Sequence, residues 1–207
     1  MADSLEDLGA ISLWKPNINW REELEYNWDI ERQILEFEGT SQDLITFSQE
    51  KPHHFNFTVT CMQKADEFAL LQKFIELRGR VKNFWFPNPI NLFTLKEEAP
   101  AGTNTLLIEL NNLEFRGYER IYFILKNKDM VARRIIGVAL DEMNQTITIS
   151  LNTVLDRLIK PQDILICSIL FLCRLENDVL EMSHKGSQTS ETKISLVELV
   201  KEYAVII

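Results

Sequence analysis

The sequence predicts a mainly β protein of the α+β class, with β-barrel or sandwich domains and one amphipathic helix packed on an N-terminal sheet. Short segments in which apolar and polar residues alternate recur at regular spacing through the C-terminal half. Only one stretch, near residues 66–79, repeats apolar residues at helical spacing. The chain has 207 residues, of which 45% are hydrophobic. It is therefore long enough to bury a core without disulfides or metals.

The chain is expected to divide into an N-terminal arm at 1–30, a strand-helix-strand subdomain at 31–100 and a β-barrel-like subdomain at 101–207. The composition shifts near residues 100–102, which sets the second boundary. The arm holds three of the four tryptophans, Trp14, Trp20 and Trp28. So much aromatic surface predicts an arm that packs either on its own domain or on a neighbouring copy.

Two strand patterns follow the arm. Residues 33–47 alternate around a turn-forming cluster at 39–42 and predict a hairpin. Residues 53–62 form the clearest half-buried strand. Its apolar face comprises Phe55, Phe57, Val59 and Cys61.

A helix is expected next, with Asp66 as its N-cap and Gly79 as the residue that ends it in a left-handed conformation. Its wide apolar face comprises Phe68, Leu70, Leu71, Phe74, Ile75 and Leu77. Residues 82–86 resume as a strand that Pro87 stops, because proline cannot donate a hydrogen bond to a neighbouring strand.

The C-terminal half is expected to be almost wholly β. Its predicted strands are 105–110, 121–126, 134–140, 146–151, 164–173, 179–183 and 194–199. Both faces of the strand at 164–173 are apolar, so it either crosses the barrel centre or meets another subunit. Its candidate interface residues are Ile164, Ile166, Ile169 and Phe171.

Composition excludes several classes of protein. The formal net charge of −9 argues against binding nucleic acid by counterion release, which needs clustered lysine and arginine. The N-terminus is acidic where a secretory signal requires positive charge. The longest apolar run has ten residues, against about 20 for a membrane-spanning helix, so no membrane partner is expected. The three cysteines lie in apolar surroundings and predict reduced core thiols.

No catalytic, cofactor-binding or metal-binding set emerges, and no cofactor is expected. His53 and His54 are neighbours on a strand, so their imidazoles point to opposite faces and cannot converge on one ion. No serine lies in a nucleophile elbow and no glycine-rich phosphate loop is present. The 31 acidic residues leave a carboxylate pair for glycoside hydrolysis open, although a solvated surface is the favoured interpretation.

The stretch from Phe68 to Pro87, which contains Arg78-Gly79-Arg80 and then Phe84-Trp85-Phe86, resembles tailed-bacteriophage tail proteins of the distal-tail or tail-tip kind. Residues 115–122 and 179–200 are similar to later segments of the same family. In that family a helix ends in an Arg-Gly-Arg-like turn that leads into an aromatic strand and a proline. The resemblance implies that Arg78 to Arg80 turn the chain, and that the aromatic strand packs on the helix or on an adjacent subunit. Simple core packing is the alternative.

The resemblance also implies a function without catalysis. The chain would form a homo-oligomeric ring, a hexamer or trimer, that joins the tail tube to the tip or baseplate. It would contact other tail proteins in the virion tail and lie in the host cytoplasm during assembly. DNA would only pass through its channel, where acidic residues would repel phosphates. Two alternatives stay open: a cytosolic β-barrel module that binds peptide or carbohydrate, and a small cell-wall hydrolase.

Overall fold

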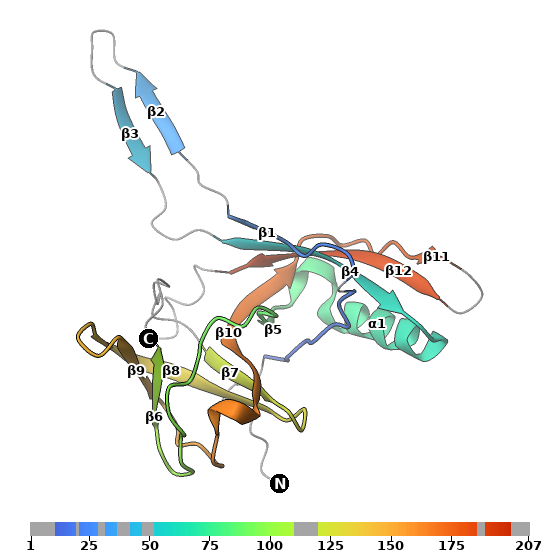
Figure 1. The fold of residues 1–207 in the computed structure, drawn as a ribbon. Coiled ribbons are helices and arrows are strands. Elements are labelled where there is room, and N and C mark those ends of the chain that lie inside the picture. Colours follow the sequence, from blue (N-terminus) through green and yellow to red (C-terminus); the bar gives the residue numbers. More distant parts are fainter. Residues whose placement is uncertain are drawn as a thin grey trace. The chain divides into compact units, whose positions relative to one another are not determined.

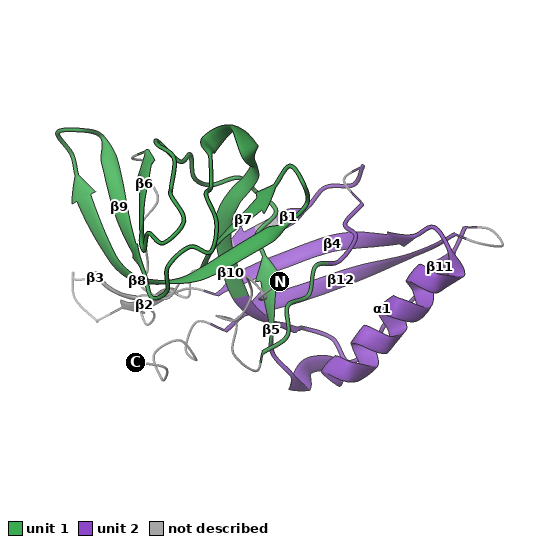
Figure 2. Ribbon diagram, turned by 90° about the horizontal axis from the view of Figure 1, so that it is seen from below, with its two compact units in different colours: residues 1–15, 84–171 green, residues 16–83, 172–207 purple. Residues whose placement is uncertain are grey.

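A computed structural model describes residues 11–19, 21–28, 32–36, 42–46, 52–109, 120–185 and 189–199. The chain divides into two compact units. Unit 1 comprises residues 1–15 and 84–171, and unit 2 comprises residues 16–83 and 172–207 (Figure 2). Each unit is therefore discontinuous in sequence, and the predicted boundary near residue 100 does not coincide with this division.

Unit 1 is an antiparallel sheet in the order β10-β7-β8-β9-β6, with β5 also paired to β10 (Figure 1). Its strands are β5 (Phe84–Pro87), β6 (Thr105–Glu109), β7 (Arg120–Leu125), β8 (Met130–Asp141), β9 (Thr146–Leu151) and β10 (Ile164–Leu175), preceded by the short helix η3 (Pro161–Asp163). All five strands of the main order contribute to one apolar core. On β9, Ile147, Ile149 and Leu151 are buried at alternate positions, as the period-two pattern predicts.

Unit 2 is an antiparallel sheet in the order β1-β4-β12, which the last residues of β10 extend. Its strands are β1 (Glu25–Trp28), β4 (His53–Cys61), β11 (Ser183–His184) and β12 (Ser190–Glu198), and a separate hairpin joins β2 (Arg32–Glu36) to β3 (Gln42–Thr46). The predicted hairpin and the predicted strand at 53–62 are therefore present. On β4 the expected apolar face is buried at every position, from Phe55 to Cys61.

Helix α1 (Lys64–Leu77) covers the apolar face of β4 and β12, and the short helix η2 (Gly79–Val81) follows it (Figure 1). Leu70 and Leu77 are its buried residues. Asp66 is not the N-cap, because the helix begins three residues earlier than predicted and Gln63 occupies that position. The Asp66 carboxylate instead accepts a hydrogen bond from the Gln63 backbone N–H at 3.1 Å, which satisfies a free donor of the first turn. Among the described residues, no helix is long and apolar enough to cross a membrane.

The mainly β class with one helix on a sheet is confirmed, but one predicted strand is wrong. Of residues 179–183, only Ser183 belongs to a strand, the two-residue β11. The residues before Ser183 are held by contacts other than strand pairing, which local patterning does not reveal. Asp178 binds Arg80, and the Glu181 carbonyl accepts a hydrogen bond from the Thr192 hydroxyl at 2.6 Å.

Candidate functional site

The turn after α1 is built by two consecutive residues with positive φ. Arg78 is the C-cap with φ 54°, and Gly79 follows with φ 60°. The helix therefore ends one residue earlier than predicted, although Gly79 does adopt the expected left-handed conformation. Arg80 then donates to Asp178 twice, through its backbone N–H at 2.8 Å and its Nε at 2.9 Å. These two bonds hold the pKa of Asp178 below its ordinary value and fix the turn to the segment after β10.

Replacing Gly79 by alanine is expected to lower the free energy of unfolding by about 2 kcal/mol, because the left-handed conformation costs an alanine 1–2 kcal/mol and the site is crowded. An added Cβ would lie 2.4 Å from Asp178 Oδ1 and 3.1 Å from its Cα. Gly102 is the matched control, since it has φ 85° but no atom of the described residues within 4 Å of an added Cβ. Chemical denaturation should show a loss of about 1 kcal/mol for Gly102→Ala. Equal losses at both glycines would contradict the role of Asp178.

The aromatic strand β5 is core rather than surface. Phe84, Trp85 and Phe86 are all essentially buried, and Pro87 is buried at the end of the strand. The Phe84 ring meets Trp14 edge to face at 5.0 Å between centroids, and the Arg120 guanidinium lies 4.2 Å from the centre of the Trp85 ring. The aromatic strand therefore packs in the core of its own chain, which was the alternative interpretation of the sequence.

The predicted subunit-interface residues are mostly committed to their own chain. Trp14 is buried, and its backbone N–H donates to the Trp85 carbonyl at 2.9 Å. Phe171 is 2% exposed. For both residues, contact with a neighbouring subunit and packing within the chain were the two open alternatives, and both side chains are buried within a single copy of the chain. Trp20 lies outside the described residues, and Trp28 is placed in β1 by its backbone.

The remaining interface candidates on β10 are half-buried. Ile164 and Ile169 pack against the core of unit 1, and Ile166 is likewise partly covered. Further carbonyl groups of this part of β10 are bonded within unit 1, because the backbone N–H groups of Asn88 and Phe93 donate to them. From Cys167 to Cys173 every residue of the strand except Ile169 is buried, whereas Leu165 is 52% exposed.

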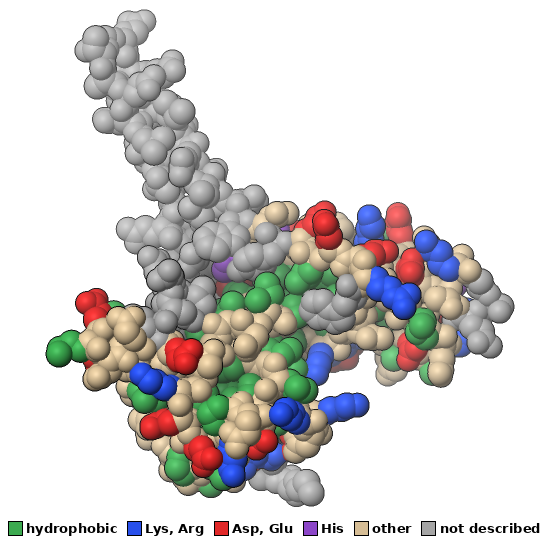
Figure 3. All heavy atoms as spheres, viewed as in Figure 1, with side chains coloured by type: hydrophobic (Ala, Val, Ile, Leu, Met, Phe, Trp, Pro, Cys, Tyr) green, Lys and Arg blue, Asp and Glu red, His purple; other side chains and the backbone are tan. Residues whose placement is uncertain are grey.

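Other apolar side chains are exposed instead. On β8, Ile136, Val138 and Leu140 form an exposed row at alternate positions, and Met143 in the following turn is 96% exposed. Figure 3 shows hydrophobic side chains at the tip of this β8–β9 hairpin. On α1, Phe68 and Ile75 are each 73% exposed, so a third of the predicted apolar helix face is not covered by the described residues of unit 2.

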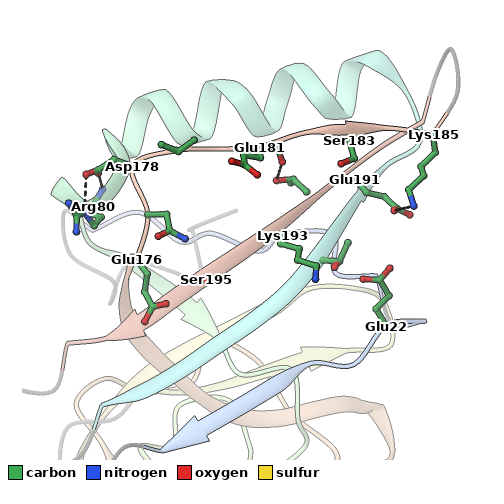
Figure 4. A pocket seen from close by; sticks show the side chains of 14 residues that line it. Glu22, Arg80, Glu176, Asp178, Glu181, Ser183, Lys185, Glu191, Lys193 and Ser195 are labelled. Carbon is green, nitrogen blue, oxygen red and sulfur yellow. Dashed lines mark hydrogen bonds and ion pairs between the residues drawn. The ribbon is translucent and has the colours of Figure 1, made fainter.

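Unit 2 also contains a polar groove with a volume of about 820 Å³ between β12 and the segment that leads from β10 to β11 (Figure 4). Five carboxylates and three basic groups line it. They are Glu22, Glu176, Asp178, Glu181, Glu191, Arg80, Lys185 and Lys193. Three of the carboxylates have partners, namely Asp178 with Arg80, Glu191 with Lys185, and Glu176 with His54. The groove is thus an acidic surface that the sequence does not reveal, because its lining comes from five separate segments.

A second feature missed by sequence reasoning is a buried ionisable pair. His53 Nδ1 contacts Glu198 Oε2, and the His53 backbone N–H donates to the same oxygen at 3.2 Å. The predicted divergence of His53 and His54 is confirmed, since His54 contacts Glu176 instead. His53 itself is buried rather than exposed. No sequence signal could identify Glu198 as the partner of His53, because the two residues lie 145 positions apart in the chain.

The cysteines are buried free thiols, as predicted. Burial raises the pKa of Cys61, Cys167 and Cys173, and at Cys173 the Glu198 carboxylate raises it further. These thiols are therefore poor nucleophiles. Within the described residues, no group of three or more His, Cys, Asp or Glu side chains could hold a metal ion.

Comparison with known sequences adds no family assignment: no protein-family model and no curated protein matches the chain.

Proposed function

We propose that the chain is a non-enzymatic structural component of a phage tail, which assembles as a ring at the distal end and joins the tail tube to the tip or baseplate. The resemblance of residues 68–87 to distal-tail proteins supports this role. The observation that carries it is the exposed row of Ile136, Val138 and Leu140 on β8. A row of aliphatic side chains on a strand face is a surface that association would remove from water.

In this role the partners are further copies of the chain, six or three in a ring, and the adjoining tail proteins. DNA passes through the channel without adhering, because the formal net charge of the chain is −9. The assembled protein belongs to the virion tail, and assembly takes place in the host cytoplasm.

Light scattering should show that the molecular mass of the purified chain rises from monomer to ring with protein concentration. The variant Val138→Asp is expected to weaken association at least about tenfold, because the charge would have to be desolvated in the contact. Ala139→Asp is the matched control, since Ala139 is also exposed but lies on the other face of the same strand. A strict monomer at the highest concentration, or equal effects of the two variants, would contradict the proposal.

A further inference from the structure

The edge of β12 that faces away from β4 is interrupted. On the β4 side, β12 is paired continuously from Ser190 to Val197. On the other side it pairs with β11 only at Ser190 and Glu191, and with β10 only from Leu196 to Glu198. Residues 192–195 therefore have no strand beside them on this edge, within the part of the chain that the structure describes.

The backbone of Lys193 points into this gap. The Ser195 carbonyl accepts a hydrogen bond from the Glu176 N–H at 3.0 Å, and the Leu199 N–H donates to the Leu172 carbonyl at 2.8 Å. Both bonds show that odd-numbered residues direct their backbone groups toward this edge, since the direction alternates along a strand. Among the described residues, the N–H and C=O of Lys193 have no hydrogen-bond partner. An open strand edge is a template for another extended chain.

The gap opens into the polar groove, whose charge is acidic. Two of its carboxylates, Glu22 and Glu181, have no ion-pair partner among the described residues, and Lys193 has none either. An adjoining hollow of about 410 Å³ shares Glu22 and Lys193 with the groove and adds Glu23 and Glu25. Figure 4 shows Glu181 on the side of β12 where the gap lies, whereas Glu22 lies beyond β4 on the other side. The charge surplus favours a basic occupant.

We propose that the gap in the β12 edge binds one extended segment of a partner polypeptide that carries lysine or arginine side chains. The main chain of the segment exchanges two hydrogen bonds with Lys193, and a basic side chain of the segment pairs with Glu181. This is recognition by strand addition, in which backbone bonds give affinity and side chains give specificity. Four strand residues span about 13 Å, which suits a segment of about four residues. The inference does not rest on the proposed assembly function.

Nuclear magnetic resonance of the ¹⁵N-labelled full chain tests this inference with two blocked hexapeptides, one alternating threonine with lysine and the other threonine with glutamate. In the free protein the Lys193 amide should exchange rapidly with solvent, whereas the Ile194 amide, paired with β4, should exchange slowly. Saturating lysine peptide should slow exchange at Lys193 at least about tenfold and leave Ile194 unchanged. The glutamate peptide should bind at least about tenfold more weakly. Unchanged exchange at Lys193, or equal affinity for the two peptides, would overturn the proposal.

Two variants at Lys193 separate the backbone from the side chain. Lys193→Ala keeps the N–H and should bind the lysine peptide at least as well as the parent, because it removes a like charge. Lys193→Pro removes the N–H on the open edge and leaves the β4 side intact, so binding should fall at least about tenfold. Should Lys193→Pro fail to fold, Glu181→Gln gives the second test. This variant should weaken binding of the lysine peptide about tenfold and leave binding of the glutamate peptide no weaker, and an unchanged lysine-peptide affinity would overturn the proposal.

Discussion

Replacing His53 by alanine is expected to lower the free energy of unfolding by about 3–5 kcal/mol, because it leaves the Glu198 carboxylate buried without its side-chain partner. The Glu198 side chain is completely buried, and among the described residues its Oε1 already has no hydrogen-bond partner. After the substitution the backbone N–H of residue 53 would be the one donor left to the carboxylate within the part of the chain that the structure describes, and a charge taken out of water needs more than one such bond. Guanidinium denaturation should show the loss as a lower midpoint with an unchanged slope.

His54 provides the matched control on the same strand. Its contact with Glu176 joins side chains that are 24% and 30% exposed, so water compensates when the contact is lost. The loss for His54→Ala should therefore stay within about 1 kcal/mol. Replacing both members of the buried pair, His53→Leu with Glu198→Leu, should recover most of the stability, since an apolar pair requires no desolvation of charge. Equal losses in the free energy of unfolding for His53→Ala and His54→Ala would show that burial of the pair does not determine the size of the loss.

The elements of this fold could be predicted where the local pattern determines burial. On β4 and β9, alternation identifies both the strand and its inward face, because successive side chains of a strand point to opposite sides. The apolar spacing at 68–77 likewise identifies α1, although it overestimates the covered face. Phe68 and Ile75 follow helical spacing and are nevertheless exposed. Periodicity shows which residues share one face of the helix. How many of them are buried depends on the width of the sheet surface on which the helix packs, and that width is set by the tertiary structure.

The pairing of strands and the composition of the groove could not be predicted. Val59 lies opposite Thr192, and Cys173 lies opposite Glu198, at sequence separations that no local rule reaches. The same long-range pairing makes each unit discontinuous, which a boundary drawn from composition cannot detect. The absence of a strand over most of 179–183 has a similar cause. The composition of residues 179–183 suits a strand, but the ion pair between Arg80 and Asp178 holds Asp178, just before this segment, to the turn after α1.

Replacing Trp85 by alanine is expected to cost about 3–5 kcal/mol of stability, as is usual when a large aromatic side chain is removed from a core. Trp85 is 1% exposed and is among the largest fully buried side chains of the described residues. Its backbone also bonds the N-terminal segment, accepting from Trp14 and donating to Ser12 at 2.9 Å each. Removing the Trp85 ring would leave a cavity beside Arg120, because the Arg120 guanidinium lies 4.2 Å from the centre of that ring. Trp85→Phe should cost less than half as much, because most of the apolar volume stays.

The same variant separates core packing from subunit contact as the role of the aromatic strand. If β5 is core, Trp85→Ala lowers the unfolding midpoint and the protein that remains folded associates as the parent does. If the strand met an adjacent subunit, the variant would weaken association and leave the stability of the monomer nearly unchanged. Phe68→Ala on the exposed face of α1 is the control, with an expected change in stability within about 0.5 kcal/mol. Since Trp85 is buried within a single copy of the chain, its loss must act on folding before it can act on assembly.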